Sequence, residues 1–124
     1  MTRNERRTKR SDLMAEAIRL QLDHSRSRAE CSAMVLADED GLCLSAVGDG
    51  PLEEIAVYSA MVGNKVENFE GTLYSQDSCF SVRIRRFTAA GARLVLCAVG
   101  GGGESRASGL QRSVGGVSRI LAAT

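Results

Sequence analysis

The stretch AMVLADEDGLCLSAVGDGPLEEIAVYSAMVGN, residues 33–64, decides the fold. Two apolar runs, CSAMVLA (31–37), which begins just before this stretch, and LCLSAV (42–47), lie on either side of the acidic turn Asp38-Glu39-Asp40-Gly41. A four-residue loop between two such runs predicts a β-hairpin. Because both runs are apolar at almost every position, they are typical of strands in the middle of a sheet that is covered on both faces.

The helix predicted after the hairpin is the most informative element. It should begin near Pro51, run to about Phe69 and stop at Gly71. Its residues 55–64, IAVYSAMVGN, carry no charge, although a helix on a monomer surface normally shows a polar side. Ile55, Val62, Val66 and Phe69 are expected to face the sheet. The small residues Ala56, Ser59, Ala60 and Gly63 form a second stripe, which favours a self-association surface; a helix buried wholly within its own domain remains the alternative.

Further strands and helices surround this region. A short strand is predicted at 72–75, an alternating strand at 79–86 and an apolar strand at 92–99. An amphipathic helix, capped by Ser11 or Asp12, should end between residues 25 and 28, and another should follow Gly100–Gly103. The predicted order is helix, two strands, helix, three strands, helix.

The 124 residues are enough for one domain, predicted over residues 12–124. Residues 1–11 are expected to form a disordered basic arm, because residues 1–10 contain five bases and one acid; a polyanion or membrane-surface contact is the other interpretation. No apolar run approaches the length of a membrane span or of a secretion signal. We therefore expect a cytoplasmic protein with reduced thiols.

The sequence offers little for catalysis, cofactors or metals. His24 is the only histidine, and the four cysteines have no zinc-ligand spacing and no predicted partner across a hairpin. The turn at Asp38 has Leu42 and Asp49 where a calcium loop needs an oxygen ligand and a glutamate. Gly100–Gly103 lacks the Lys-Ser/Thr of a phosphate loop. We predict a non-enzymatic protein without a cofactor or metal site.

The hairpin 33–42, its second strand and the following Leu52-Glu53-Glu54-Ile55-Ala56 resemble the roadblock (dynein light chain) domain, and the resemblance covers about residues 12–121. It implies an α/β fold, with a five-stranded antiparallel sheet between the middle helix and the two terminal helices. It also implies homodimers formed through the middle helix and the strand at 72–75. Bacterial members commonly bind or activate a small Ras-like GTPase and have no nucleotide site of their own.

The expected dimer and partner contacts follow from the uncharged helix and from this resemblance. They are Ala56, Tyr58, Ser59, Ala60, Met61, Gly63, Thr72, Leu73 and Tyr74. The alternative is a small-ligand sensing or protein-interaction module of the same fold that is not linked to a GTPase. Nucleic-acid binding through the basic arm is a weaker alternative, because residues 31–124 carry eight bases and ten acids.

Overall fold

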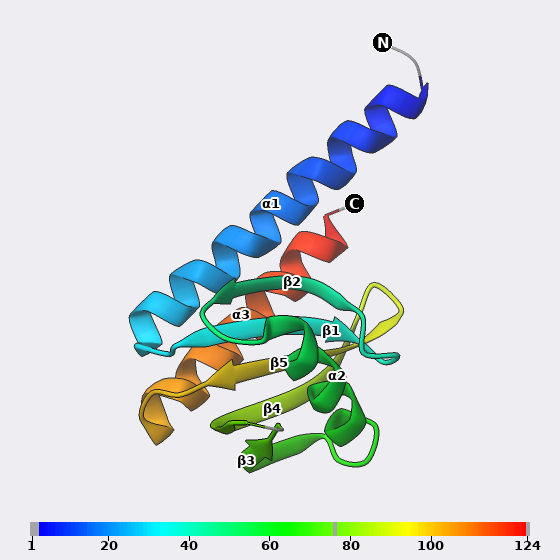
Figure 1. Cartoon of the computed structure of the whole chain (residues 1–124). Coiled ribbons are helices and arrows are strands. Elements are labelled where there is room, and N and C mark those ends of the chain that lie inside the picture. The colour runs from blue at the N-terminus through cyan, green and yellow to red at the C-terminus, as the bar shows by residue number, and fades with distance from the viewer. Residues whose placement is uncertain (1–2, 76, 124) are drawn as a thin grey trace.

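The structure is a computed structural model that describes residues 3–75 and 77–123, and Figure 1 shows a sheet packed between helices. The helices are α1 (Arg3–Ala29), α2 (Leu52–Gly63) and α3 (Gly103–Ala122). The strands are β1 (Ala33–Asp38), β2 (Cys43–Gly48), β3 (Asn68–Tyr74), β4 (Cys79–Ala89) and β5 (Ala92–Val99). They form one five-stranded sheet in the order β2-β1-β5-β4-β3, with every neighbouring pair antiparallel. The predicted fold class and element order are confirmed.

The helices cover both faces of the sheet. Met34 of β1 and Leu96 of β5 pack with Leu22 of α1 and Leu110 of α3 in one core. Alternate residues of the same strands, among them Val35, pack against α2 in a second core. Because successive side chains of a strand point to opposite faces, β1 and β5 must be apolar wherever both faces are covered, and their sequences are apolar except at Asp38 and Arg93.

The acidic hairpin turn is held by its first side chain. Asp38 Oδ1 accepts hydrogen bonds from the backbone N–H groups of Asp40 at 2.9 Å and Leu42 at 3.0 Å. Gly41 has a φ of 89°, which favours glycine. The carboxylate is thus used within the turn, as expected for a hairpin and not for a calcium loop.

The placement of β2 in the middle of the sheet is a wrong prediction. In the structure β2 is an edge strand that pairs with β1 alone. Its register shifts between Ala37, which faces Cys43, and Leu36, which faces Ser45. The shift is the geometry of a β-bulge, which is common at sheet edges.

The middle helix is shorter than the sequence predicts, because α2 ends at Gly63 and β3 begins at Asn68. Val66 and Phe69 therefore do not belong to the helix. The spacing that suggested a continuing stripe is overridden by sheet pairing: each residue of β3, from Asn68 to Tyr74, faces a residue of β4. Tertiary pairing commonly outweighs a local helical pattern of this length.

The first helix is longer than predicted. α1 begins at Arg3, so the expected disordered arm at residues 1–11 and the expected cap at Ser11 or Asp12 are wrong for the described part of that segment. Residues 3–10 contain four Arg, one Lys and one Glu, all good helix formers, and neither Gly nor Pro. They can thus extend, toward the N-terminus, a helix whose later residues, such as Ile18 and Leu22, pack in the core. No helix in residues 3–75 and 77–123 is long and apolar enough to cross a membrane.

Strands β4 and β5 are joined by a two-residue turn. Ala89 faces Ala92, and the turn is made by Ala90 and Gly91, with φ values of 52° and 78°. Positive φ at both central residues is the two-residue turn that suits the twist of a hairpin. Consequently Cys97 faces Ile84, so no cysteine lies opposite it in this hairpin.

Candidate functional site

The small residues of α2 lie on its inner face. Ala56, Ser59, Ala60 and Gly63 are all buried against the sheet of their own chain. Their expected role as the surface on which a second chain packs needs correction, since a partner cannot reach them without unfolding the helix from the sheet. The sequence pattern correctly indicated a stripe of small residues that permits close packing, but the element that packs against this stripe is the sheet of the same chain.

The reason for small side chains at this stripe is the closeness of α2 to β5. A Cβ at Gly63 would lie 2.7 Å from Val95 Cγ2, which is too close for a real contact. Ser59 lies near the thiol of Cys97, and burial raises the pKa of that thiol to about 12. The inner face of α2 is therefore a tightly packed, structural surface.

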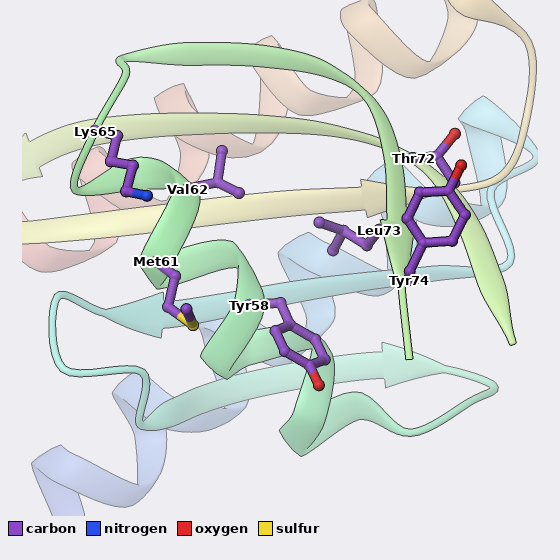
Figure 2. Close-up of a pocket in the computed structure, with 7 residues that line it drawn as sticks. All are labelled: Tyr58, Met61, Val62, Lys65, Thr72, Leu73 and Tyr74. Atoms are coloured by element: carbon purple, nitrogen blue, oxygen red, sulfur yellow. The ribbon is translucent and has the colours of Figure 1, made fainter. Parts of the chain in front are cut away.

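The outer side of α2 and strand β3 together form an open groove of about 300 Å³. Figure 2 shows its lining side chains, with Tyr58 and Met61 extending from α2 and Tyr74 from the end of β3. Met61 is 57% exposed and Tyr74 is 74% exposed. Large apolar side chains this exposed on neighbouring elements are typical of a protein-interaction surface. The lining residues are Tyr58, Met61, Val62, Lys65, Thr72, Leu73 and Tyr74.

Five of the nine predicted contact residues thus come together at one groove. They are Tyr58, Met61, Thr72, Leu73 and Tyr74. The other four, Ala56, Ser59, Ala60 and Gly63, lie on the buried inner face of α2. Val62 and Lys65 also line the groove and were not among the predicted contacts. The place of Val62 could have been inferred from Tyr58, since residues four apart share a helix face. Lys65 lies just after the end of α2, so helical spacing does not place it.

Strand β3 gives the groove a backbone component. It is an edge strand, paired with β4 on one side of the described sheet. The other side of an edge strand presents N–H and C=O groups that can pair with a strand from another chain. The groove therefore combines apolar anchors with a pairing edge, which is the combination used in strand addition.

A second exposed apolar region lies at the opposite edge of the sheet and was missed from the sequence. A hollow of about 250 Å³ is lined by Gly41, Leu42, Cys43, Glu53 and Val57. Leu42, Leu44 and Val57 are exposed. The edge position of β2 would have revealed this region, but its almost wholly apolar sequence indicated a central strand.

The glycine-rich loop before α3 serves packing. Gly100 and Gly101 both have a φ of 75°. A Cβ at Gly100 would lie 3.0 Å from Ser32 Oγ, and one at Gly101 3.2 Å from the carbonyl oxygen of Ala29. Glycine is thus required by conformation and by close approach to the residues before β1.

Arg106 anchors the start of α3 beside this loop. Its guanidinium is buried and donates hydrogen bonds to Ser81 Oγ at 2.9 Å and to the Gly100 carbonyl at 3.3 Å. It also pairs with Glu70 at 3.3 Å, and Glu70 pairs with Arg83 at 2.9 Å. These contacts fasten α3 to strands β3 and β4.

Three of the four thiols, those of Cys31, Cys43 and Cys97, are poor nucleophiles in this setting. Burial raises the pKa of Cys31 and Cys43 above the usual value, as it does for Cys97. All four cysteines are free, and residues 3–75 and 77–123 hold no group of three His, Cys, Asp or Glu that could bind a metal ion. What the site offers is apolar side chains and an edge strand.

Fold and groove together define the class: a small α/β domain with the architecture expected from the roadblock resemblance and an exposed apolar groove on α2 and β3. No protein-family profile matches the sequence, and no curated protein matches it either.

Solved structures of MglB have the same fold. The structure from Thermus thermophilus, described as gliding protein MglB, aligns with a TM-score of 0.68 at 15% identity over 90% of this chain and 93% of that one. Myxococcus xanthus MglB aligns with a TM-score of 0.65 at 12% identity over 88% and 90%. MglB in a tetrameric arrangement aligns with a TM-score of 0.66 at 13% identity over 89% and 91%.

Proposed function

We propose that the chain is a self-associating cytoplasmic scaffold that binds and regulates a small Ras-like GTPase, without being an enzyme itself. The observation that carries this proposal is the groove between α2 and β3, where exposed Met61 and Tyr74 adjoin an unpaired sheet edge. The roadblock resemblance of residues 12–121 and the shared fold with MglB support it.

A second copy of the chain fits this groove. Two β3 strands can pair antiparallel across a two-fold axis, so that two five-stranded sheets join and the outer sides of two α2 helices meet. Met61 would then be removed from water, and burial of such a side chain contributes about 1.5–3 kcal/mol. One of the matching MglB structures is described as tetrameric, which supports self-association of this fold.

The groove favours a protein over a small ligand. A sensing module needs an enclosed cavity with converging polar groups. This groove is open and mostly apolar, with Lys65 and the hydroxyl groups of Thr72, Tyr58 and Tyr74 as its polar side-chain groups. A small ligand would be left largely exposed there.

The assembly is tested by light scattering coupled to size-exclusion chromatography. The wild-type chain should elute with twice its monomer mass, and Met61→Glu should elute as a monomer because it places a charge in the contact. Leu20→Glu is the matched control: Leu20 is 52% exposed on α1, on the other face of the sheet, and this variant should remain a dimer. A monomeric wild type, or an unchanged Met61→Glu dimer, would overturn the assembly.

GTPase binding is tested by calorimetry with purified Ras-like GTPases of the source organism, each loaded with GDP or a non-hydrolysable GTP analogue. We expect binding that depends on the nucleotide and that weakens in Met61→Glu but not in Leu20→Glu. No binding to any of them in either state would contradict the GTPase role while leaving the assembly to its own test.

A further inference from the structure

The beginning of α1 extends past the rest of the molecule. α1 and α3 run antiparallel, since Gly109 lies against Ala29 and Gly116 against Gln21. Continuing this register places Ala122, the last residue of α3, beside the turn of α1 that contains Met14. Residues 3–13 therefore lie beyond the end of α3, over about 15 Å at 1.5 Å per residue. Figure 1 shows this end of α1 away from the sheet.

This extension carries the positive charge of the chain. Residues 3–10 include five bases and one acid, whereas residues 31–124 have eight bases and ten acids. An anionic surface would thus attract the extension and not the body. The charge asymmetry also gives such an attraction a fixed orientation.

Two exposed leucines follow the basic turns on the outer side of α1. Leu13 is 65% exposed and Leu20 is 52% exposed, and their spacing of seven residues places both on one helix face. Lys9 is exposed and precedes Leu13 by four residues, so helical spacing puts this base on the same side as Leu13. Ile18 and Leu22, by contrast, are buried in the core.

We propose that the N-terminal part of α1 docks on an anionic membrane surface. Bases beside exposed leucines are the composition of a helix that lies at a bilayer interface, where lysine and arginine meet lipid phosphates and leucine enters the headgroup region. Nucleic acid accounts for the bases but gives the leucines no role. The surface lies on the face of the sheet opposite α2, so it is independent of the proposed dimer and GTPase contacts.

The test is flotation of the whole chain with vesicles of phosphatidylcholine containing about a quarter phosphatidylglycerol. We expect binding at about 0.1 M NaCl, strong weakening at about 0.5 M, and no binding to pure phosphatidylcholine. The double variant Arg6→Gln, Arg10→Gln should weaken binding about 30-fold, at about fivefold for each base near the surface. Leu13→Gln should weaken it about tenfold at unchanged charge.

The control is Arg28→Gln, Arg93→Gln, which removes the same charge from exposed positions elsewhere. It should bind vesicles as the wild type does. Equal weakening by both double variants would show a general charge effect and overturn the assignment to α1. Absence of wild-type binding, or tighter binding to a short DNA duplex at the same salt, would overturn the membrane proposal. Circular dichroism should show unchanged folding of every variant.

Discussion

The backbone of Gly63 lies directly against the side chain of Val95: a Cβ at position 63 would be 2.7 Å from Val95 Cγ2 and 3.3 Å from Val95 Cγ1. Val95 is completely buried in the centre of the sheet and has little room to move. This contact sets the distance between α2 and the sheet, and so fixes the position of the exposed Met61 and the half-buried Tyr58 on that helix.

Gly63→Ala should destabilise the fold by about 1 kcal/mol, although alanine is the better helix former. Val95→Ala should cost about 2 kcal/mol through loss of buried volume. The double variant should lose about 1 kcal/mol less free energy of unfolding than the two single variants lose together, because the new methyl group occupies the space that the Val95 side chain vacates. Urea unfolding of the four proteins measures this coupling.

Gly103→Ala is the matched control, since a Cβ there would meet nothing closer than Glu70 Oε1 at 4.0 Å. It should leave the free energy of unfolding unchanged within about 0.5 kcal/mol. Strict additivity of Gly63→Ala and Val95→Ala would contradict the contact as the cause.

The ion pair between Glu70 and Arg106 yields a second prediction. Glu70→Ala removes one partner of a buried guanidinium and should destabilise the fold by about 1–2 kcal/mol. Glu67→Ala, an exposed glutamate just before β3, should change stability by less than about 0.5 kcal/mol. Thermal unfolding of both variants measures the two losses of stability. Equal losses would mean that the ion pair between Glu70 and Arg106 contributes nothing beyond surface charge.

The sequence could predict much of this architecture because the local signals agree with the tertiary structure. Strand β5 has the predicted bounds, Ala92–Val99, since an apolar run buried on both faces is distinctive. The acidic turn at Asp38 and the glycine-led start of α3 are likewise local features. The length of α2 could not be predicted, because Phe69 keeps helical spacing and only the pairing of β3 with β4 removes it from the helix.

The side of α2 that faces the sheet could not be predicted from the sequence either. Small residues such as Ala60 permit close approach of any neighbour, and their pattern does not distinguish a sheet of the same chain from a helix of another. Met61 and Val57 are the large exposed side chains within the uncharged run, but from the sequence alone apolar residues at these positions are equally compatible with a place in the core. Only the placement of the helix on the sheet shows which side remains free.

Tyr74 provides a test of the proposed self-association at the strand edge. Tyr74→Ala should raise the dimer dissociation constant about 10- to 100-fold, because aromatic side chains at the centre of an interface contribute disproportionately. Tyr74→Phe keeps the ring and should dissociate within about threefold of the wild type. Sedimentation equilibrium measures the dimer dissociation constants of the wild type and of the two variants. An unchanged constant for Tyr74→Ala would place the contact elsewhere, with the exposed region around Leu42 and Val57 as the next surface to vary.

The buried thiol of Cys97 makes stability depend on pH in the alkaline range. Its pKa is about 12 in the folded chain, against an ordinary value of 9.0, because burial disfavours the thiolate. The unfolded chain therefore loses this proton first, and stability falls as the pH rises from about 9 toward 12. Between pH 8 and pH 10 the loss from this group should be about 1.4 kcal/mol.

Urea unfolding of the wild type and of Cys97→Ala at both pH values isolates that loss. The variant is less stable at pH 8, because it lacks buried volume, but the gap between the two proteins should narrow by about 1.4 kcal/mol at pH 10. A gap for Cys97→Ala that stays constant would mean that water reaches the thiol in the folded chain, which is incompatible with the tight contact of α2 on the sheet.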